Sequence, residues 1–228
     1  MLLAAHPSRH GVLADSIDPS IRNEEDPDDR DPELDLFGDA VPAPPYPREW
    51  LVRYRQAQLD RLDRITDRVV AQLEALRTAG RPHEERAFVV HGTMADPAIF
   101  DATIDPNERE IGVSDLGDPR LVNNGPVGLA RYSSLRSWLS QWSPRHARAD
   151  GLRAAASLDI PVLSIYNGAD NVCYPSMALG VDAAIAHDDK ALHRIDGATH
   201  YYIGPDQRGP LREATSIASA WLRDHDFE

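Results

Sequence analysis

The chain has 228 residues, 42% of them hydrophobic and 27% charged, which is the composition of an ordinary globular protein with a sizeable apolar core. Its formal net charge of −13 argues against nucleic acid and against an anionic membrane surface as partners. Cys173 is the one cysteine, so a disulfide framework and a thiolate metal cluster are excluded, and a reducing cytoplasm is the simplest location.

Residues 1–14 open with the short apolar run Met1-Leu-Leu-Ala-Ala, which His6 and Pro7 follow. The run lacks the basic start of a signal peptide, and nothing in the chain approaches the roughly 20 apolar residues of a membrane-spanning helix. We therefore expect a buried core strand that stops at Pro7, where pairing ends. Pro7 also breaks the helix that a metal site built from His6 and His10 would need.

Residues 15–150 are expected to form an acidic, proline-rich linker and then a helical cap. The stretch from Asp15 to Asp39 holds eleven acidic residues against two arginines, which predicts irregular surface chain. Within it, Asp26-Pro-Asp-Asp-Arg-Asp31 contains a proline and lacks the glycine of a calcium-binding loop, so calcium is not expected there.

Two amphipathic helices are predicted in the cap. From Arg48 to Ala79 apolar residues recur every three or four positions, and Gly80 follows as a stop signal. A strand-like piece comes next over 87–91, and a second helix is predicted over 127–142. An amphipathic helix of the first kind packs its apolar face against another element.

Residues 151–228 alternate regularly between strand and helix patterns. Strands are predicted over 161–166 and 192–195, and helices over 175–186 and 208–223. This order predicts parallel pairing and an α/β sheet, so we expect this segment to be a carboxyl-terminal α/β core. Three parallel strands, counting the amino-terminal one, leave an unpaired edge through which we expect the chain to self-associate.

Each of the two predicted strands leads into a glycine-containing turn with a titratable side chain. The first is followed by Asn167-Gly-Ala-Asp170 and the second by Asp196-Gly-Ala-Thr-His200. Taken singly, each of the two residues is more simply interpreted as an ordinary turn or loop residue. Because catalytic groups collect at the carboxyl ends of parallel strands, the pair together predicts a carboxylate that orients a histidine as a general base. This arrangement indicates a hydrolase.

These pieces resemble the carboxyl-terminal part of the α/β-hydrolase superfamily. Pro161-Val-Leu-Ser-Ile precedes the acid, and the Gly197-Ala-Thr-His200 turn precedes the last helix, in the family's order. Asn167 stands where the family usually has glycine, and asparagine tolerates the same left-handed backbone. The resemblance implies that Asp170 is the triad acid and His200 the base, with no metal or organic cofactor. Met1-Leu-Leu-Ala-Ala-His-Pro is similar to the family's sixth strand, after which a cap is inserted.

The chain contains no nucleophile elbow, neither Gly-x-Ser-x-Gly nor its Cys or Asp versions. The candidate nucleophiles lack the flanking glycines of such a turn; they are Ser133, Ser134, Ser164, Ser176 and Cys173. Cys173 follows Asp170 too closely and is interpreted as a small apolar filler. By the resemblance, the elbow would lie upstream of Met1.

Other histidines and aromatic residues receive minor roles. Phe88-Val-Val-His91-Gly92 fits an oxyanion-hole strand locally, but no elbow follows it, so His91 is expected in the cap, with substrate contact left open. His6 is expected to line the pocket from the end of its strand. Four aromatic residues are expected to pack rather than to bind ligand: Tyr201, Tyr202, Trp138 and Trp142.

The sequence thus predicts an α/β-hydrolase-like enzyme with a small-molecule substrate, by default a carboxylic ester or a related acyl compound. Epoxide, carbon–halogen and carbon–carbon hydrolysis occur on the same frame. This chain alone is expected to be inactive, because the nucleophile lies outside it. The alternative is a non-catalytic interaction module derived from a hydrolase, with the helix from Arg48 to Ala79 as its docking face.

Overall fold

The computed structural model describes residues 1–226 and divides the chain into two compact units. The first unit comprises Met1–Pro7, Ala102–Asp115 and the chain from Asp150 onward; the second comprises Ser8–Asp101 and Leu116–Ala149. Two segments differ from the expected division at 1–14, 15–150 and 151–228. Residues 102–115 join the first unit because they hydrogen-bond to its loops, and residues 8–14 join the second because Leu13 packs in its core.

The first unit contains a parallel three-stranded sheet. Its elements are β1 (Leu2–Leu3), α5 (Gly151–Ala155), β6 (Val162–Asn167), α6 (Pro175–Ala184), β7 (Lys190–Ile195) and α7 (Arg208–Asp224). The strand order is β1-β6-β7, and β6 and β7 pair along their whole lengths, from Val162 opposite Lys190 to Asn167 opposite Ile195. The predicted alternation of strands and helices is confirmed, with ends shifted by one or two residues.

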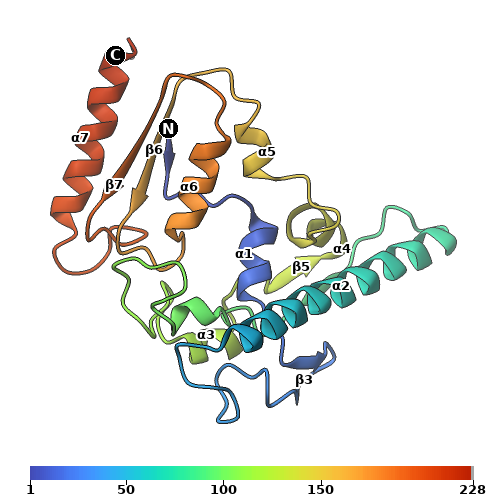
Figure 1. Ribbon diagram of the computed structural model, residues 1–228. Helices are drawn as coiled ribbons and strands as arrows, with labels where there is room; N and C mark the ends of the chain where they lie inside the picture. Colours follow the sequence, from blue (N-terminus) through green and yellow to red (C-terminus); the bar gives the residue numbers. More distant parts are fainter. Residues whose placement is uncertain (227–228) are drawn as a thin grey trace. The chain divides into compact units, whose positions relative to one another are not determined.

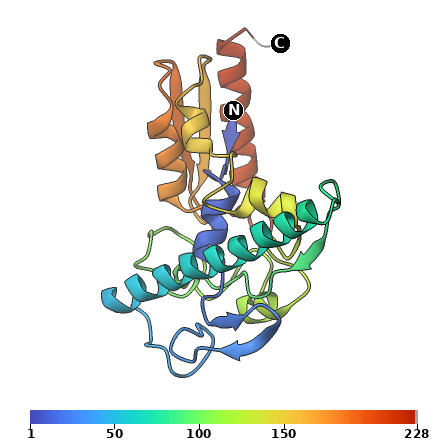
Figure 2. The same ribbon diagram turned by 90° about the vertical axis from the view of Figure 1, so that its right-hand side faces the viewer.

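Helices cover both faces of this sheet, because successive strand residues point to opposite sides. Leu163 and Ile195 pack on one face against Ala214 of α7. Val162 packs on the other face against Val181 of α6 and Ala155 of α5. Figures 1 and 2 show α7 on one side of the sheet and α5 and α6 on the other. The unit is therefore a mixed α/β structure in which α6 forms the crossover between the parallel strands β6 and β7.

Strand β1 lies at the edge of the sheet and is less buried than predicted. Leu2 pairs with Ser164 and Leu3 with Ile165, both in parallel. Among the described residues, β6 is the only strand that pairs with β1, and the side chain of Leu3 is 42% exposed. The predicted strand is confirmed, but the prediction that it is buried is wrong, because a buried strand needs a neighbouring strand on each side.

The second unit is mostly helical. Its elements are α1 (Arg9–Ser16), β2 (Ile21–Asn23), β3 (Asp26–Arg30), α2 (Arg48–Thr78), β4 (Ala87–Val89), η1 (Pro97–Ile99), α3 (Pro119–Asn124), β5 (Tyr132–Ser134), α4 (Leu135–Ser137) and the π-helical turn η2 (Trp138–Trp142). Helix α1 was not expected. It begins after Ser8, whose hydroxyl accepts a hydrogen bond from the N–H of Gly11, the usual cap of a helix start.

Helix α2 confirms the predicted amphipathic helix, ending at Thr78 rather than Ala79. Its apolar stripe is buried in the core of its own unit, where Leu62, Ile65 and Val69 pack against Leu13 and Trp138. The stripe that the alternative hypothesis offers to a partner is thus occupied within the unit.

The prediction that the acidic stretch is irregular surface chain is wrong. Strands β2 and β3 pair in it as an antiparallel hairpin, and Asp18 and Ile21 are fully buried. Its acidic residues find arginines far away in the chain: both carboxylate oxygens of Glu24 accept hydrogen bonds from the buried guanidinium of Arg61 on α2, at 2.8 and 2.7 Å. Composition alone does not reveal such partners.

The helix predicted over 127–142 begins later than expected. Strand β5 occupies part of that range and pairs in antiparallel with β4. Ser134 then caps a short helix, since its hydroxyl accepts a hydrogen bond from the N–H of Ser137, whose own hydroxyl accepts one from the N–H of Ser134.

None of the helices among residues 1–226 is both long and apolar enough to cross a bilayer.

Candidate active site

The register of β6 and β7 brings the two predicted site residues together within the first unit. Asn167 lies opposite Ile195, so the loops that follow these residues leave the sheet at the same edge. The N–H of Gly168 donates to the carbonyl of Ile195 at 2.7 Å, and the N–H of Ala169 donates to the carbonyl of Ala198 at 2.9 Å. We call residues 168–173 the acid loop and residues 196–201 the base loop.

The carboxylate of Asp170 is fully buried and held in one orientation. Its Oδ1 atom accepts hydrogen bonds from the backbone N–H groups of Val172 and Cys173, both at 2.8 Å. Its Oδ2 atom lies 2.8 Å from Nδ1 of His200, and Oδ1 lies 3.1 Å from the same nitrogen. The acid loop therefore aims the carboxylate at the imidazole.

His200 presents its other ring nitrogen for chemistry. With Nδ1–H donating to a carboxylate, the neutral ring carries its lone pair on Nε2. Among the described residues, Nε2 has no hydrogen-bonding partner, while the side chain as a whole is only 10% exposed. An imidazole oriented in this way can take a proton at Nε2 as a general base.

Asn167 has a role at the site that the sequence did not predict. It does not adopt the left-handed backbone expected of it. Instead its side chain is fully buried, and Nδ2 donates to the carbonyl of Thr199 at 2.9 Å while Oδ1 accepts from the hydroxyl of Tyr202 at 2.8 Å. Asn167 thus ties the base loop to the end of β6. A buried polar residue at the end of a strand is the signal that could have indicated it.

His6 lies beside His200, as expected for a residue at the end of β1. The two ring centroids are 5.5 Å apart. Burial lowers the pKa of His6, and the nearby His200 lowers it further, while the charge of Asp170 acts in the opposite direction. Nδ1 of His6 is buried without a hydrogen-bonding partner among the described residues.

The aromatic residues divide between the two expected roles. Trp138 is fully buried and Tyr202 packs beside α7, which confirms packing for both. Tyr201 is 62% exposed, and its ring makes an edge contact with His200 at 4.5 Å between centroids. The expectation of packing is therefore wrong for Tyr201, which forms part of the surroundings of the base.

No candidate nucleophile of the first unit hydrogen-bonds to the imidazole. None of Ser164, Ser176 and Cys173 has a hydrogen bond to His200, and Ser133 and Ser134 belong to the second unit. Cys173 is buried, and desolvation together with the charges of Asp170 and Asp105 raises the pKa of its thiol to about 12. His91 belongs to the second unit, where its carbonyl accepts a hydrogen bond from Arg61.

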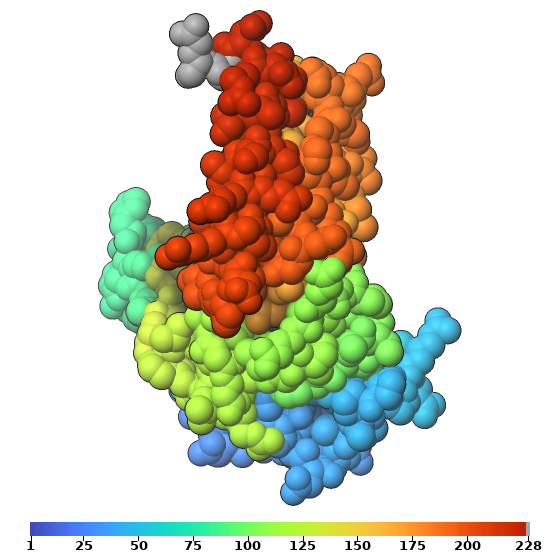
Figure 3. Space-filling model, turned by 90° about the vertical axis from the view of Figure 1, so that its left-hand side faces the viewer, coloured from blue at the N-terminus to red at the C-terminus, as the bar shows by residue number. Residues whose placement is uncertain are grey.

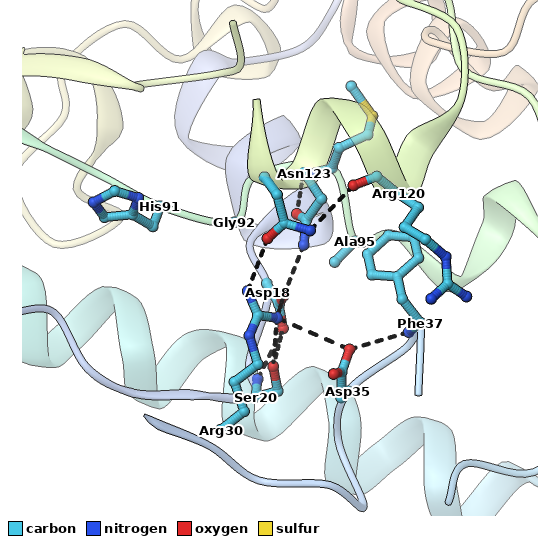
Figure 4. Close-up of polar contacts among 12 residues, drawn as sticks. Asp18, Ser20, Arg30, Asp35, Phe37, His91, Gly92, Ala95, Arg120 and Asn123 are labelled. Atoms are coloured by element: carbon cyan, nitrogen blue, oxygen red, sulfur yellow. Dashed lines mark hydrogen bonds and ion pairs between the residues drawn. The ribbon is translucent and has the colours of Figure 1, made fainter. Parts of the chain in front are cut away.

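A separate polar cluster centres on Asp18 in the second unit. Oδ1 of Asp18 accepts from the N–H and hydroxyl of Ser20, and Oδ2 accepts from Arg30 at 2.7 Å and from Asn123 at 2.8 Å. Figure 4 shows these side chains converging on the carboxylate from the hairpin and from α3. Since every lone pair of this buried carboxylate accepts a hydrogen bond, we interpret the cluster as stabilising the contact between the hairpin and α3, and not as a reactive site.

Within residues 1–226, no group of three or more His, Cys, Asp or Glu side chains is arranged to hold a metal ion. Searches for similar proteins add no further constraint: no family model, no curated protein and no solved structure matches this chain. The contact between Asp170 and His200 is therefore the feature on which a functional interpretation rests.

Proposed function

We propose that the first unit carries the acid and base of an α/β-hydrolase-type catalytic triad that hydrolyses carboxylic esters or related acyl bonds. The observation that carries the proposal is the contact of 2.8 Å between a buried carboxylate and Nδ1 of His200, with Nε2 left unpartnered among the described residues. Both residues follow directly from adjacent parallel strands, where catalytic groups of α/β sheets collect.

In the proposed reaction His200 transfers the protons. Nε2 accepts the proton of the nucleophile as the nucleophile's oxygen or sulfur forms a bond to the acyl carbon. The resulting imidazolium returns that proton to the leaving alcohol as the acyl–oxygen bond breaks. A water molecule then attacks the acyl carbon while Nε2 accepts one of its protons, the bond between the acyl group and the nucleophile breaks, and the imidazolium returns the proton to the nucleophile as the carboxylic acid leaves. Asp170 holds the Nδ1–H tautomer and stabilises the imidazolium throughout.

The nucleophile is assigned to a segment outside this sequence, since the 228 residues hold no elbow. The open edge of β1 supports this assignment. Among the described residues β1 pairs with β6 alone, and Leu3 is 42% exposed, so a further parallel strand has a place to pair. In the proposed arrangement this strand ends beside His6 and delivers the nucleophile toward Nε2 of His200.

The decisive experiment is to translate the nucleotides upstream of the first codon. An in-frame elbow identifies the nucleophile, and the longer chain is then assayed with short-chain aryl esters. We expect turnover that falls about 10⁴-fold in an Asp170→Asn variant, because the wrong imidazole tautomer is then stabilised. The 228-residue chain itself should hydrolyse these esters no faster than its His200→Ala variant.

Two outcomes would contradict this proposal in different ways. Turnover by the 228-residue chain that His200→Ala abolishes would refute the external nucleophile while keeping the base. A longer chain that folds, carries no elbow and melts cooperatively without activity would favour a non-catalytic interaction module.

A further inference from the structure

Residues 102–115 run along the loops that carry the acid and the base, within the first unit. In Figure 3 the green that marks this part of the sequence lies against the orange of the carboxyl-terminal part. The sequence predicts that these residues belong to the cap, and the structure gives them no helix or strand. Its contacts are nevertheless concentrated on the functional loops, and we call it the strap.

Glu108 of the strap hydrogen-bonds to both loops at once. Its backbone N–H donates to the carbonyl of Gly168 in the acid loop at 2.9 Å. Its Oε2 atom accepts from the N–H of Gly197 in the base loop at 2.6 Å, and its Oε1 atom pairs with the guanidinium of Arg194. A single residue therefore bridges the two loops.

The neighbouring Asn107 adds a second contact to the acid loop. Its Nδ2 atom donates to the carbonyl of Asp170 at 2.6 Å. Its Oδ1 atom accepts from the backbone N–H and the guanidinium of Arg109, so the amide is fixed in this orientation. Further along, the carbonyl of Val113 accepts a hydrogen bond from Asn171 at 3.3 Å.

The fit at Gly168 is close. A Cβ atom at this position would lie 2.6 Å from Oε2 of Glu108 and 3.1 Å from the carbonyl oxygen of Ile195. Only glycine leaves room for the carboxylate to reach past the acid loop to Gly197. Glycine is therefore required at position 168 by the contact with Glu108 of the strap as well as by the turn.

We propose that Glu108 is a positioning residue that holds the acid loop and the base loop at the spacing which lets Asp170 hydrogen-bond to Nδ1 of His200. Its catalytic meaning rests on the proposed function, but its structural effect does not. No hydrogen bond joins Glu108 to His200 or to the carboxylate of Asp170, so in this proposal it acts through the backbone of the two loops.

The test is nitrogen-15 NMR of the histidine rings in the 228-residue chain, which reports the tautomer of His200 without any turnover. In Glu108→Ala we expect loss of the single Nδ1–H form and exchange of that proton with solvent at least about 10-fold faster than in the unaltered chain. Glu108→Asp should act similarly, because the shorter side chain keeps the charge but cannot reach Gly197. Glu108→Asp also tests the proposal if Glu108→Ala does not fold.

Two further variants separate positioning from charge. Glu108→Gln keeps an acceptor for the N–H of Gly197 and should retain the Nδ1–H form. Asp196 is exposed, and its Oδ1 atom lies 2.8 Å from Nε of Arg194, so it is the second carboxylate that pairs with this arginine. Asp196→Asn removes that charge and should leave the tautomer of His200 unchanged. An unchanged tautomer in both Glu108→Ala and Glu108→Asp, or an equal effect of Asp196→Asn, would overturn the proposal. Absence of the Nδ1–H form in the unaltered chain would instead count against the proposed function.

Discussion

The imidazole of His6 packs against that of His200, with 5.5 Å between the ring centroids and an angle of 37° between the planes. The two rings come from opposite ends of the sequence and meet because β1 and β7 flank β6 in the sheet. Two imidazoles at this distance cannot both be protonated without repulsion, and burial adds to the cost of charging His6.

This contact predicts an acid-sensitive first unit. Because the pKa of His6 is lowered in the folded state, the unfolded chain binds more protons at mildly acidic pH, and stability rises with pH through that range. Urea unfolding should give a falling free energy of unfolding as pH drops below the ordinary value of 6.5, with a shallower fall in His6→Gln. Equal pH dependence in the two proteins would contradict the prediction. His83, which is exposed, supplies the matched control as His83→Gln.

The second prediction concerns the buried carboxylate of Asp18. In Asp18→Ala the guanidinium of Arg30 and the amide of Asn123 lose their shared acceptor inside the protein. We expect the free energy of unfolding of the second unit to fall by about 3 kcal/mol. Urea titrations followed by tryptophan fluorescence report mainly this unit, since it contains three of the four tryptophans, Trp50, Trp138 and Trp142.

Asp29→Ala is the control for this change. Asp29 lies in the same hairpin, but its side chain is 47% exposed and its ion pair with Arg22 is long, at 4.0 Å. Its removal should alter stability by no more than about 0.5 kcal/mol. If Asp18→Ala lowers the free energy of unfolding as little as Asp29→Ala does, the cluster around Asp18 does not stabilise the second unit.

The third prediction uses the close approach at Gly168. In Gly168→Ala the added methyl group meets the carboxylate of Glu108, and we expect a loss of about 1–3 kcal/mol in the first unit. Glu108→Ala should remove part of that loss in a double-mutant cycle, since the methyl group then faces only the carbonyl of Ile195. Additive effects would show that the carboxylate does not fill this space. Gly209→Ala, with nothing within 4 Å of the added atom, is the control; because Gly209 lies in helix α7, this change should not destabilise the first unit.

The fourth prediction distinguishes Cys173 from a catalytic nucleophile. With a thiol pKa of about 12 against an ordinary value of 9.0, the native protein should react with iodoacetamide roughly 1000-fold more slowly than the chain in denaturant. Mass spectrometry of timed samples gives both rates. The rate should not change in His200→Ala, because no hydrogen bond links the thiol to the imidazole. A drop in that variant would return Cys173 to the list of nucleophiles.

Elements with a clear side-chain pattern could be predicted from the sequence. The apolar stripe of α2 marks its buried side, the apolar run of β6 marks a buried strand, and the alternation of strands and helices after residue 150 implies a parallel sheet. Because parallel strands end at a common edge, the positions of Asp170 and His200 after those strands were sufficient to predict that they meet.

Tertiary structure alone decided where polar residues find their partners. The acidic stretch looked like solvated chain, yet Glu24 reaches Arg61 and Asp18 reaches Asn123, more than a hundred residues away. Glu108 likewise has no local pattern that links it to Gly197. Periodicity records which side of an element faces the core, whereas the partner of a charge depends on which distant segments the folded chain brings within hydrogen-bonding distance.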